Sequence, residues 1–277
     1  MKKVLLTDCP DEKGLIAKIT SLCFEHQLNI VKNNEFVDNI NSRFFMRTEL
    51  EGDFSNHNLI PQLARILPPK SHLRLEGQDK QKVVLLATKE AHCLGGVLLK
   101  CFENALNIEV VAVIANYDTL APLVAGFNIP FHVISHEGLT RSEHDKAVAD
   151  KVAQYQPDLI GLAKYMRILT PEFVQQFSGK IINIHHSFLP AFIGAKPYQQ
   201  AYQRGVKIIG ATAHFVTDEL DEGPIITQDV IHVTHDNDAA ALAQLGRDVE
   251  KNVFCKALQL ASEHRIFIND NKTVVFR

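Results

Sequence analysis

The chain has 277 residues, of which 46% are hydrophobic and 22% are charged, and its formal net charge is -3. This length suits two domains, and the composition excludes fibrous, low-complexity and disordered classes. The near balance of acidic and basic residues gives no electrostatic reason to expect a nucleic-acid partner. No apolar run is long enough to span a membrane or to form a signal-peptide core. We therefore expect a cytoplasmic protein whose partner is a small molecule, with no nucleic acid and no membrane.

The cysteines show neither a disulfide framework nor a thiolate metal site. Their number is odd and none forms a C-x-x-C pair, so we expect free thiols at Cys9, Cys23, Cys93, Cys101 and Cys255. His92-Cys93 could be a nucleophile pair or half of a metal site, but adjacent side chains seldom point the same way and no acidic partner is evident. We favour a structural role for this pair and expect no bound metal.

Residues 1–80 have the pattern of one small α/β domain. The expected order is strand 3–7, helix 14–27, strands 30–37 and 43–50 around a polar turn, helix 58–67 and strand 71–75. This βαββαβ order predicts a ferredoxin-like fold, with a four-stranded antiparallel sheet and both helices on one face. Residues 76–82 contain no apolar side chain, which is typical of a linker. We therefore expect one domain at 1–80 and a second at 81–277.

The second domain has the sequence pattern of a doubly wound α/β fold. Continuous apolar runs, typical of strands that are covered on both faces, lie at 83–87, 110–114, 131–134, 159–162 and 181–184. Helical patterns separate most of them, which predicts a mostly parallel sheet with ligands beyond the carboxyl ends of its strands. Two more extended runs, a long helix at about 238–264 and a hairpin-like ending at 265–276 complete the chain.

A nucleotide cofactor is not expected. The turn after the first strand of the second domain reads Thr88-Lys89-Glu90-Ala91-His92-Cys93-Leu94-Gly95-Gly96. It matches neither G-x-G-x-x-G nor the Walker pattern, and Glu90 would repel phosphate. NAD, FAD and ATP are therefore excluded, and we expect no cofactor.

Three polar residues near the end of the last apolar run suggest chemistry. Alternation along a strand puts Asn183 and His185 on one face, while Asp221 lies in an acidic turn that Gly223-Pro224 ends. An amide, an imidazole and a carboxylate are the groups needed to cleave a formamide without metal. The structural alternative is that Asn183 and His185 satisfy backbone groups and that Asp221 caps a turn. An isolated Asn-x-His would favour that alternative.

A family resemblance decides between these interpretations. The strings Asn183-Ile184-His185-x-Ser187-x-Leu189-Pro190, Gly210-x-Thr212-x-His214-Phe215-Val216 and Asp221-x-Gly223-Pro224 resemble the signature of the folate-dependent formyltransferases, typified by glycinamide ribonucleotide formyltransferase. The resemblance implies a formyl-transfer site at Asn183, His185 and Asp221. It also implies a folate pocket along 162–170, with folate-binding positions at Met166, Arg167, Ile168, Leu169 and Asp218.

Two departures narrow the resemblance. The turn 88–94 lacks the glycine-rich phosphate loop of those transferases, and His186 stands where they usually have proline. Together with the run 191–198, Lys89-x-x-His92-Cys93-Leu94 and the first domain, this pattern is similar over the full length to 10-formyltetrahydrofolate deformylases. That resemblance implies hydrolysis of the folate substrate to formate and tetrahydrofolate, which balances one-carbon folates and supplies formate for purine synthesis.

The resemblance also implies roles for the three residues. Asp221 would orient and deprotonate water, Asn183 would stabilise the oxyanion with help from His185, and His185 could deliver a proton to N10. Which of its two roles His185 mainly plays stays open. The alternatives are a formyltransferase with an unrecognised amine acceptor and a catalytically silent sensor of folate or an amino acid.

The first domain resembles an ACT domain, a module that commonly binds an amino acid and pairs through its sheets. The turn 8–15 and the segment 28–30 match the usual ligand-facing places, which implies effector positions at Asp8, Gly14, Leu15 and Asn29. Glycine and methionine are the expected effectors, and a homo-oligomer is the expected assembly. The structural alternative, in which Asp8 begins a turn and Gly14 permits a close helix start, stays open.

Overall fold

The computed structural model describes residues 1–55, 58–190 and 197–277. By their contacts they form two compact units. The first comprises Met1–Asp79, Glu263–Asn269 and Thr273–Arg277, and the second comprises Lys80–Ser262 and Asp270–Lys272. In the part of the chain that the structure describes, no helix is both long and apolar enough to cross a membrane.

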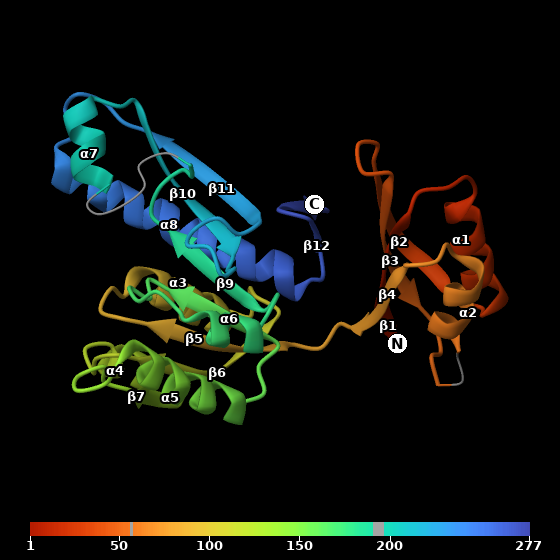
Figure 1. Ribbon diagram of the computed structural model, residues 1–277, viewed down its shortest axis with the longest axis horizontal. Helices are drawn as coiled ribbons and strands as arrows, with labels where there is room; N and C mark the ends of the chain where they lie inside the picture. The colour runs from red at the N-terminus through yellow and green to blue at the C-terminus, as the bar shows by residue number, and fades with distance from the viewer. Residues whose placement is uncertain (56–57, 191–196) are drawn as a thin grey trace. The chain divides into compact units, whose positions relative to one another are not determined.

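The first unit has the expected βαββαβ order. Its elements are β1 (Lys2–Pro10), α1 (Leu15–Glu25), β2 (Asn29–Asp38), β3 (Arg43–Glu51), α2 (Leu59–Ile66) and β4 (His72–Gly77). The strands form an antiparallel sheet in the order β2-β3-β1-β4, and both helices lie on one side of it (Figure 1). Buried residues at helical spacing, Leu15, Ile19 and Leu22, pack α1 onto this face. The predicted fold of this domain is thus confirmed.

The opposite face of this sheet is covered by the end of the chain. Strands β12 (Ile266–Asn269) and β13 (Lys272–Val275) form a hairpin, and Phe267 and Phe276 pack with Val4, Leu6 and Phe45. The sequence placed residues 263–277 in the second domain, but most of them belong to the first unit. Alternating apolar and polar residues in a short hairpin show that one of its faces is apolar, but they do not show which sheet that face will cover.

Arg47 fastens the start of this C-terminal segment. Its side chain is almost fully buried, and it donates hydrogen bonds to the carbonyl oxygens of Glu263 and His264 at 2.9 and 3.0 Å. Glu49 pairs with the same guanidinium at 2.6 Å. Arg47 therefore ties residues 263–264 to β3 within the first unit.

The second unit is a seven-stranded sheet in the order β11-β10-β9-β8-β5-β6-β7. Its strands are β5 (Gln81–Ala87), β6 (Ile108–Ala115), β7 (Phe131–Val133), β8 (Leu159–Ala163), β9 (Ile181–His185), β10 (Ile208–Phe215) and β11 (Ile225–His232). Strands β5 to β9 are parallel, whereas β10 is antiparallel to both β9 and β11. The expectation of a mostly parallel, doubly wound sheet is confirmed.

Helices cover both faces of this sheet. They are α3 (His92–Phe102), α4 (Ala121–Ala125), α5 (Arg141–Gln154), α6 (Pro171–Gln176), α7 (Pro197–Arg204) and α8 (Ala239–Ser262). Helices α5 and α6 pack through Val148, Val152 and Phe173 onto one face. The long α8 crosses the other face, where a Cβ at Gly161 would lie 2.9 Å from the ring of Phe254. Glycine at 161 therefore lets α8 approach the sheet closely.

We predict that Phe267→Ala lowers the free energy of unfolding of the first unit by about 3–5 kcal/mol, because it removes a buried ring from the face that Phe45 shares. The neighbouring Ile268 is 45% exposed, so Ile268→Ala is the matched control and should cost about 0.5 kcal/mol or less. Denaturant unfolding with hydrogen exchange at β1 and β3 measures both. Equal costs for the two variants would contradict the packing described here.

Candidate active site

The reaction centre forms where β9 ends against β10. Asn183 and His185 lie two residues apart on β9 and therefore on one face, as the sequence predicted. The antiparallel register places His214 of β10 opposite Asn183 and Thr212 opposite His185. The loop after β10 then brings Asp221 to both histidines. Its Oδ2 is 3.2 Å from His185 Nδ1, and its Oδ1 is 3.6 Å from His214 Nε2.

The structure thus brings together the three residues predicted for catalysis and adds a fourth, His214. Asn183 Nδ2 is 3.2 Å from His214 Nε2, and His214 Nδ1 donates to the carbonyl oxygen of Phe215 at 2.8 Å. His214 therefore links the amide to the carboxylate. His214 stands in one of the motifs that carry the resemblance, and its place two residues after Thr212 on a strand was the signal that the two side chains share a face.

Asp221 is held as a carboxylate. Burial alone would raise its pKa, but hydrogen bonds from His185 and His214 outweigh that effect and lower the pKa far below its ordinary value. Its backbone is in the left-handed region, with a φ of 58°, which is uncommon for a residue other than glycine. Such conformations persist where surrounding contacts hold them, and they cluster at functional sites.

His185 presents its second ring nitrogen to the site. Its Nδ1 donates to Asp221, while Nε2 is buried and has no hydrogen-bond partner. A buried polar atom without a partner is costly, which makes this nitrogen a candidate for a hydrogen bond to a ligand that reaches it. The ring of His186 stacks on that of His185, with centroids 4.8 Å apart. Burial, and then the nearby charge of Lys164, lower the pKa of His186 to about 4, which keeps this second imidazole neutral.

A cavity of about 470 Å³ opens over these residues. The predicted folate-binding residues line it together with the reaction centre: Met166, Arg167, Ile168, Leu169, Asp218, Asn183, His185 and Asp221. Apolar side chains such as Val174 and Val216 contribute to the same wall. A planar, partly apolar ligand with a polar edge suits such a mixed lining.

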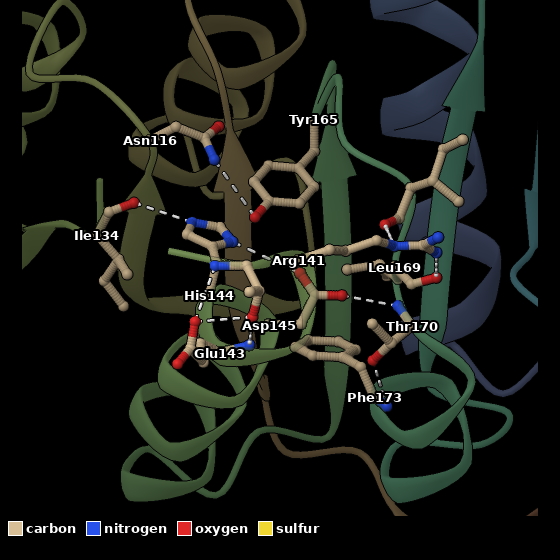
Figure 2. A network of polar contacts seen from close by, with 12 residues as sticks. Asn116, Ile134, Arg141, Glu143, His144, Asp145, Tyr165, Leu169, Thr170 and Phe173 are labelled. Atoms are coloured by element: carbon tan, nitrogen blue, oxygen red, sulfur yellow. Dashed lines mark hydrogen bonds and ion pairs between the residues drawn. The ribbon is translucent and has the colours of Figure 1, made fainter. Parts of the chain in front are cut away.

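The loop that carries residues 164–170 is fastened from behind by α5, as Figure 2 shows. Arg141 donates to the carbonyl oxygen of Ile168 at 2.8 Å and also to that of Leu169. One helical turn later, the buried Asp145 accepts the backbone N–H of Thr170 at 2.7 Å. These bonds leave the other side of the loop free to face the cavity.

The ends of β5 and β6 hold the same loop at its start. Thr88 accepts the backbone N–H of Met166 at 3.0 Å and donates to the side-chain oxygen of Asn116, also at 3.0 Å. Lys89, in the turn that the sequence singled out, lies over the ring of Tyr117 at 4.0 Å from its centroid. The turn after β5 thus supports the loop 164–170.

His92 and Cys93 differ in their surroundings. His92 Nε2 donates to Glu250 of α8 at 2.8 Å, a partner 158 positions away that the sequence did not reveal. Cys93 is buried, and burial raises the pKa of its thiol well above the ordinary value. These three side chains offer donor atoms within 4.8 Å of one another, but Lys164 and Tyr198 already contact the Glu250 carboxylate. A neutral thiol and a competing ammonium make a poor cation site.

The four predicted effector positions do not meet in one chain. Asp8 lies near the end of β1 and pairs with Arg43, and Gly14, with a φ of 89°, directly precedes α1. Leu15 belongs to the core. Asn29 begins β2 opposite Glu51, whereas Asp8 pairs with Phe45. Because β1 and β2 run in the same direction on either side of β3, Asn29 lies about 20 Å from Asp8 along the strands.

Of the run 191–198 on which the narrower resemblance drew, residues 191–196 lie outside the described residues. Tyr198 is described, and its hydroxyl donates to Glu250 at 2.5 Å. A Cβ at position 246 would lie 2.0 Å from that hydroxyl, so glycine at 246 makes room for the bond.

Comparison with known proteins identifies the family of each domain. An ACT domain model matches residues 3–68, and a formyl transferase model matches residues 81–258. Formyltetrahydrofolate deformylases of Haemophilus influenzae and Escherichia coli K12 are 61% and 59% identical over 274 residues, which is 99% of this chain and 99% and 98% of theirs.

Solved structures show the same relationship. A formyltetrahydrofolate deformylase from Pseudomonas syringae has a TM-score of 0.95 at 37% identity, covering 100% of this chain and 95% of that one. A glycinamide ribonucleotide transformylase from Symbiobacterium toebii has a TM-score of 0.69 at 28% identity, covering 74% of this chain and 98% of that one. The chain therefore belongs to the formyltetrahydrofolate deformylase family.

Proposed function

We propose that this enzyme hydrolyses 10-formyltetrahydrofolate to formate and tetrahydrofolate with Asn183, His185 and Asp221 as its catalytic residues. The observation that carries this proposal is the geometry at the end of β9. A buried carboxylate, an imidazole with an unpartnered nitrogen and an amide lie together on the wall of one cavity. These groups can align water, donate to an oxyanion and move a proton.

The mechanism follows from the protonation of Asp221. As a carboxylate that also accepts from His185, it orients a water molecule and takes a proton as the oxygen bonds to the formyl carbon. Asn183 donates an N–H to the resulting oxyanion, and a protonated His185 can donate from Nε2. Collapse then breaks the C–N10 bond as N10 takes a proton, which leaves formate and tetrahydrofolate.

The folate ring system belongs in the cavity that residues 164–169 line. Its wall combines apolar side chains with the exposed backbone of that loop, and Asp218 lies at the same cavity. The backbone can supply donors and acceptors to a heterocycle while Leu169 and Val174 contact its faces. We propose Met166, Arg167, Ile168, Leu169 and Asp218 as the substrate-binding residues.

We propose that the reaction needs neither cofactor nor metal. Asp221 supplies the base and Asn183 the oxyanion donor, so the three groups complete the chemistry of hydrolysis without a Lewis acid. The formate released would supply purine synthesis, and the reaction would balance the pool of one-carbon folates. The assays below should therefore run equally well after dialysis against EDTA.

Asp221→Asn tests the catalytic assignment. It keeps the size of the side chain but replaces one acceptor oxygen with an NH2 group and removes the base, so kcat should fall roughly 100-fold or more while tetrahydrofolate binding persists. Glu222→Gln, an exposed change in the same loop, is the matched control and should leave kcat unchanged. Formate release and calorimetric titration of tetrahydrofolate give the two readouts. Near wild-type turnover in Asp221→Asn would refute the role of Asp221.

We further propose that an amino acid, glycine or methionine, binds the first unit at the turn before α1. Gly14 has no side chain to cap the helix, so the first N–H groups of α1 are available to a carboxylate, and Asp8 lies at the end of the adjoining strand. Because Asn29 lies at the other end of the sheet, it could join such a site only from a second copy of the chain. A homo-oligomer is thus part of this proposal.

Titration of glycine and methionine into the full-length protein tests the effector site. We expect one of them to bind and to change the rate of formate release, and we expect Asp8→Asn to weaken that response about tenfold or more, as for a charged hydrogen bond. Glu25→Gln, an exposed change at the far end of α1, should respond like the wild type. If neither amino acid binds or alters the rate, the first unit serves assembly and does not act as a sensor.

A further inference from the structure

A second cavity of about 620 Å³ adjoins the reaction centre. It shares Lys164, Met166 and His186 with the first cavity, and its remaining wall includes His92, Tyr198 and Glu250. Three features that the sequence analysis singled out, the turn 88–94, His186 and the end of the run 191–198, therefore meet at one place. The catalytic roles proposed above use none of them.

Glu250 organises this second cavity. Its side chain is only 1% exposed, and three donors approach its two oxygens. Tyr198 lies 2.5 Å from Oε1, while His92 and Lys164 lie 2.8 and 3.1 Å from Oε2. Burial alone would raise its pKa, but the bond from His92 and the charge of Lys164 lower it to about 2. Glu250 is therefore a buried carboxylate whose hydrogen-bonding capacity the protein itself fills.

Both the backbone conformation and the burial of Lys164 are energetically unfavourable. Its φ is 58°, in the left-handed region that favours glycine, and its side chain is 6% exposed although lysine is seldom buried. Strained backbone and a buried ammonium are each unfavourable, and together they indicate a functional demand. The demand is local to the reaction centre, because Lys164 lines the same cavity as Asn183 and His185.

The two features together suggest how the enzyme chooses its acceptor. A buried carboxylate beside the reaction centre would bind the ammonium form of a small amine and hold it near the formyl carbon. In this protein the ammonium group of Lys164 already occupies that carboxylate. Water needs no such anchor. Because it is small and neutral, it can bind in the cavity beside the ammonium group of Lys164.

We propose that Lys164 is a specificity-determining residue whose ammonium group, paired with Glu250, occupies the amine position of the second cavity and so reserves the reaction for water. This inference rests on the proposed hydrolysis of 10-formyltetrahydrofolate. It assigns the second cavity to the acceptor and the first to the folate. The bound ammonium would first lose a proton to solvent, and the resulting amine would attack the same formyl carbon and lose a second proton to Asp221. Collapse would then break the C–N10 bond as N10 takes a proton, which releases an N-substituted formamide and tetrahydrofolate.

The test is competition between water and methylamine. Wild type and Lys164→Gly are incubated with 10-formyltetrahydrofolate and methylamine, and N-methylformamide and formate are quantified by mass spectrometry. Glycine suits the backbone at 164 and uncovers Glu250. We expect the ratio of N-methylformamide to formate to rise about tenfold or more in Lys164→Gly, in the range of other selectivity changes.

Three further variants sharpen the result. Asn128 has a φ of 57° and is exposed, so Asn128→Gly relieves the same kind of backbone strain away from both cavities and should keep the wild-type ratio. The double variant, Lys164→Gly with Glu250→Gln, also removes the carboxylate. Its ratio of N-methylformamide to formate should therefore return to near the wild-type value. Lys164→Asn, a small neutral residue that tolerates a positive φ, repeats the test if Lys164→Gly does not fold.

An unchanged product ratio in a folded Lys164 variant that binds tetrahydrofolate would overturn the inference. So would an equal gain in the double variant, because the amine would then not depend on Glu250. Failure of the proposed function would look different, because the wild-type enzyme would then release no formate in the absence of methylamine.

Discussion

The contact between Asp221 and His185 is the interaction on which the site depends. It joins a loop residue to the last residue of β9. Because β10 is antiparallel to β9 and ends beside the start of β9, the loop after β10 folds back along β9 to bring Asp221 to His185. The same contact, together with the one from His214, keeps the carboxylate ionised, and it leaves His185 Nε2 without a hydrogen-bond partner.

Around this contact, two supports keep the cavities in shape. Helix α5 fastens the loop 164–170 through Arg141 and Asp145, so the backbone that faces the folate cavity is bonded from behind. On the other side, Glu250 gathers donors from the loop after β8 and from α3 and α7. Lys164 belongs to both arrangements, so the proposed choice of acceptor lies in the same segment that we propose to position the folate.

Much of this architecture could be predicted from local patterns. Alternation along β9 was enough to pair Asn183 with His185, and the order of apolar runs was enough for both sheets. What local patterns lacked was information on partners far apart in sequence. Glu250 meets Lys164 from a helix 86 positions later, His214 meets Asn183 through strand register, and the hairpin with Phe267 covers a sheet that begins at residue 2. Asn29 shows a related limit, because the resemblance groups it with Asp8 although the strand register places the two residues at opposite ends of the sheet within one chain.

The central claim is that Asp221 directs a water molecule at the formyl carbon. The most direct measurement is the isotopic composition of the formate produced in water enriched in oxygen-18. If water attacks the formyl carbon, each formate carries one oxygen from the solvent and one from the substrate. Formate without solvent oxygen, or a formyl group recovered on another acceptor, would contradict it.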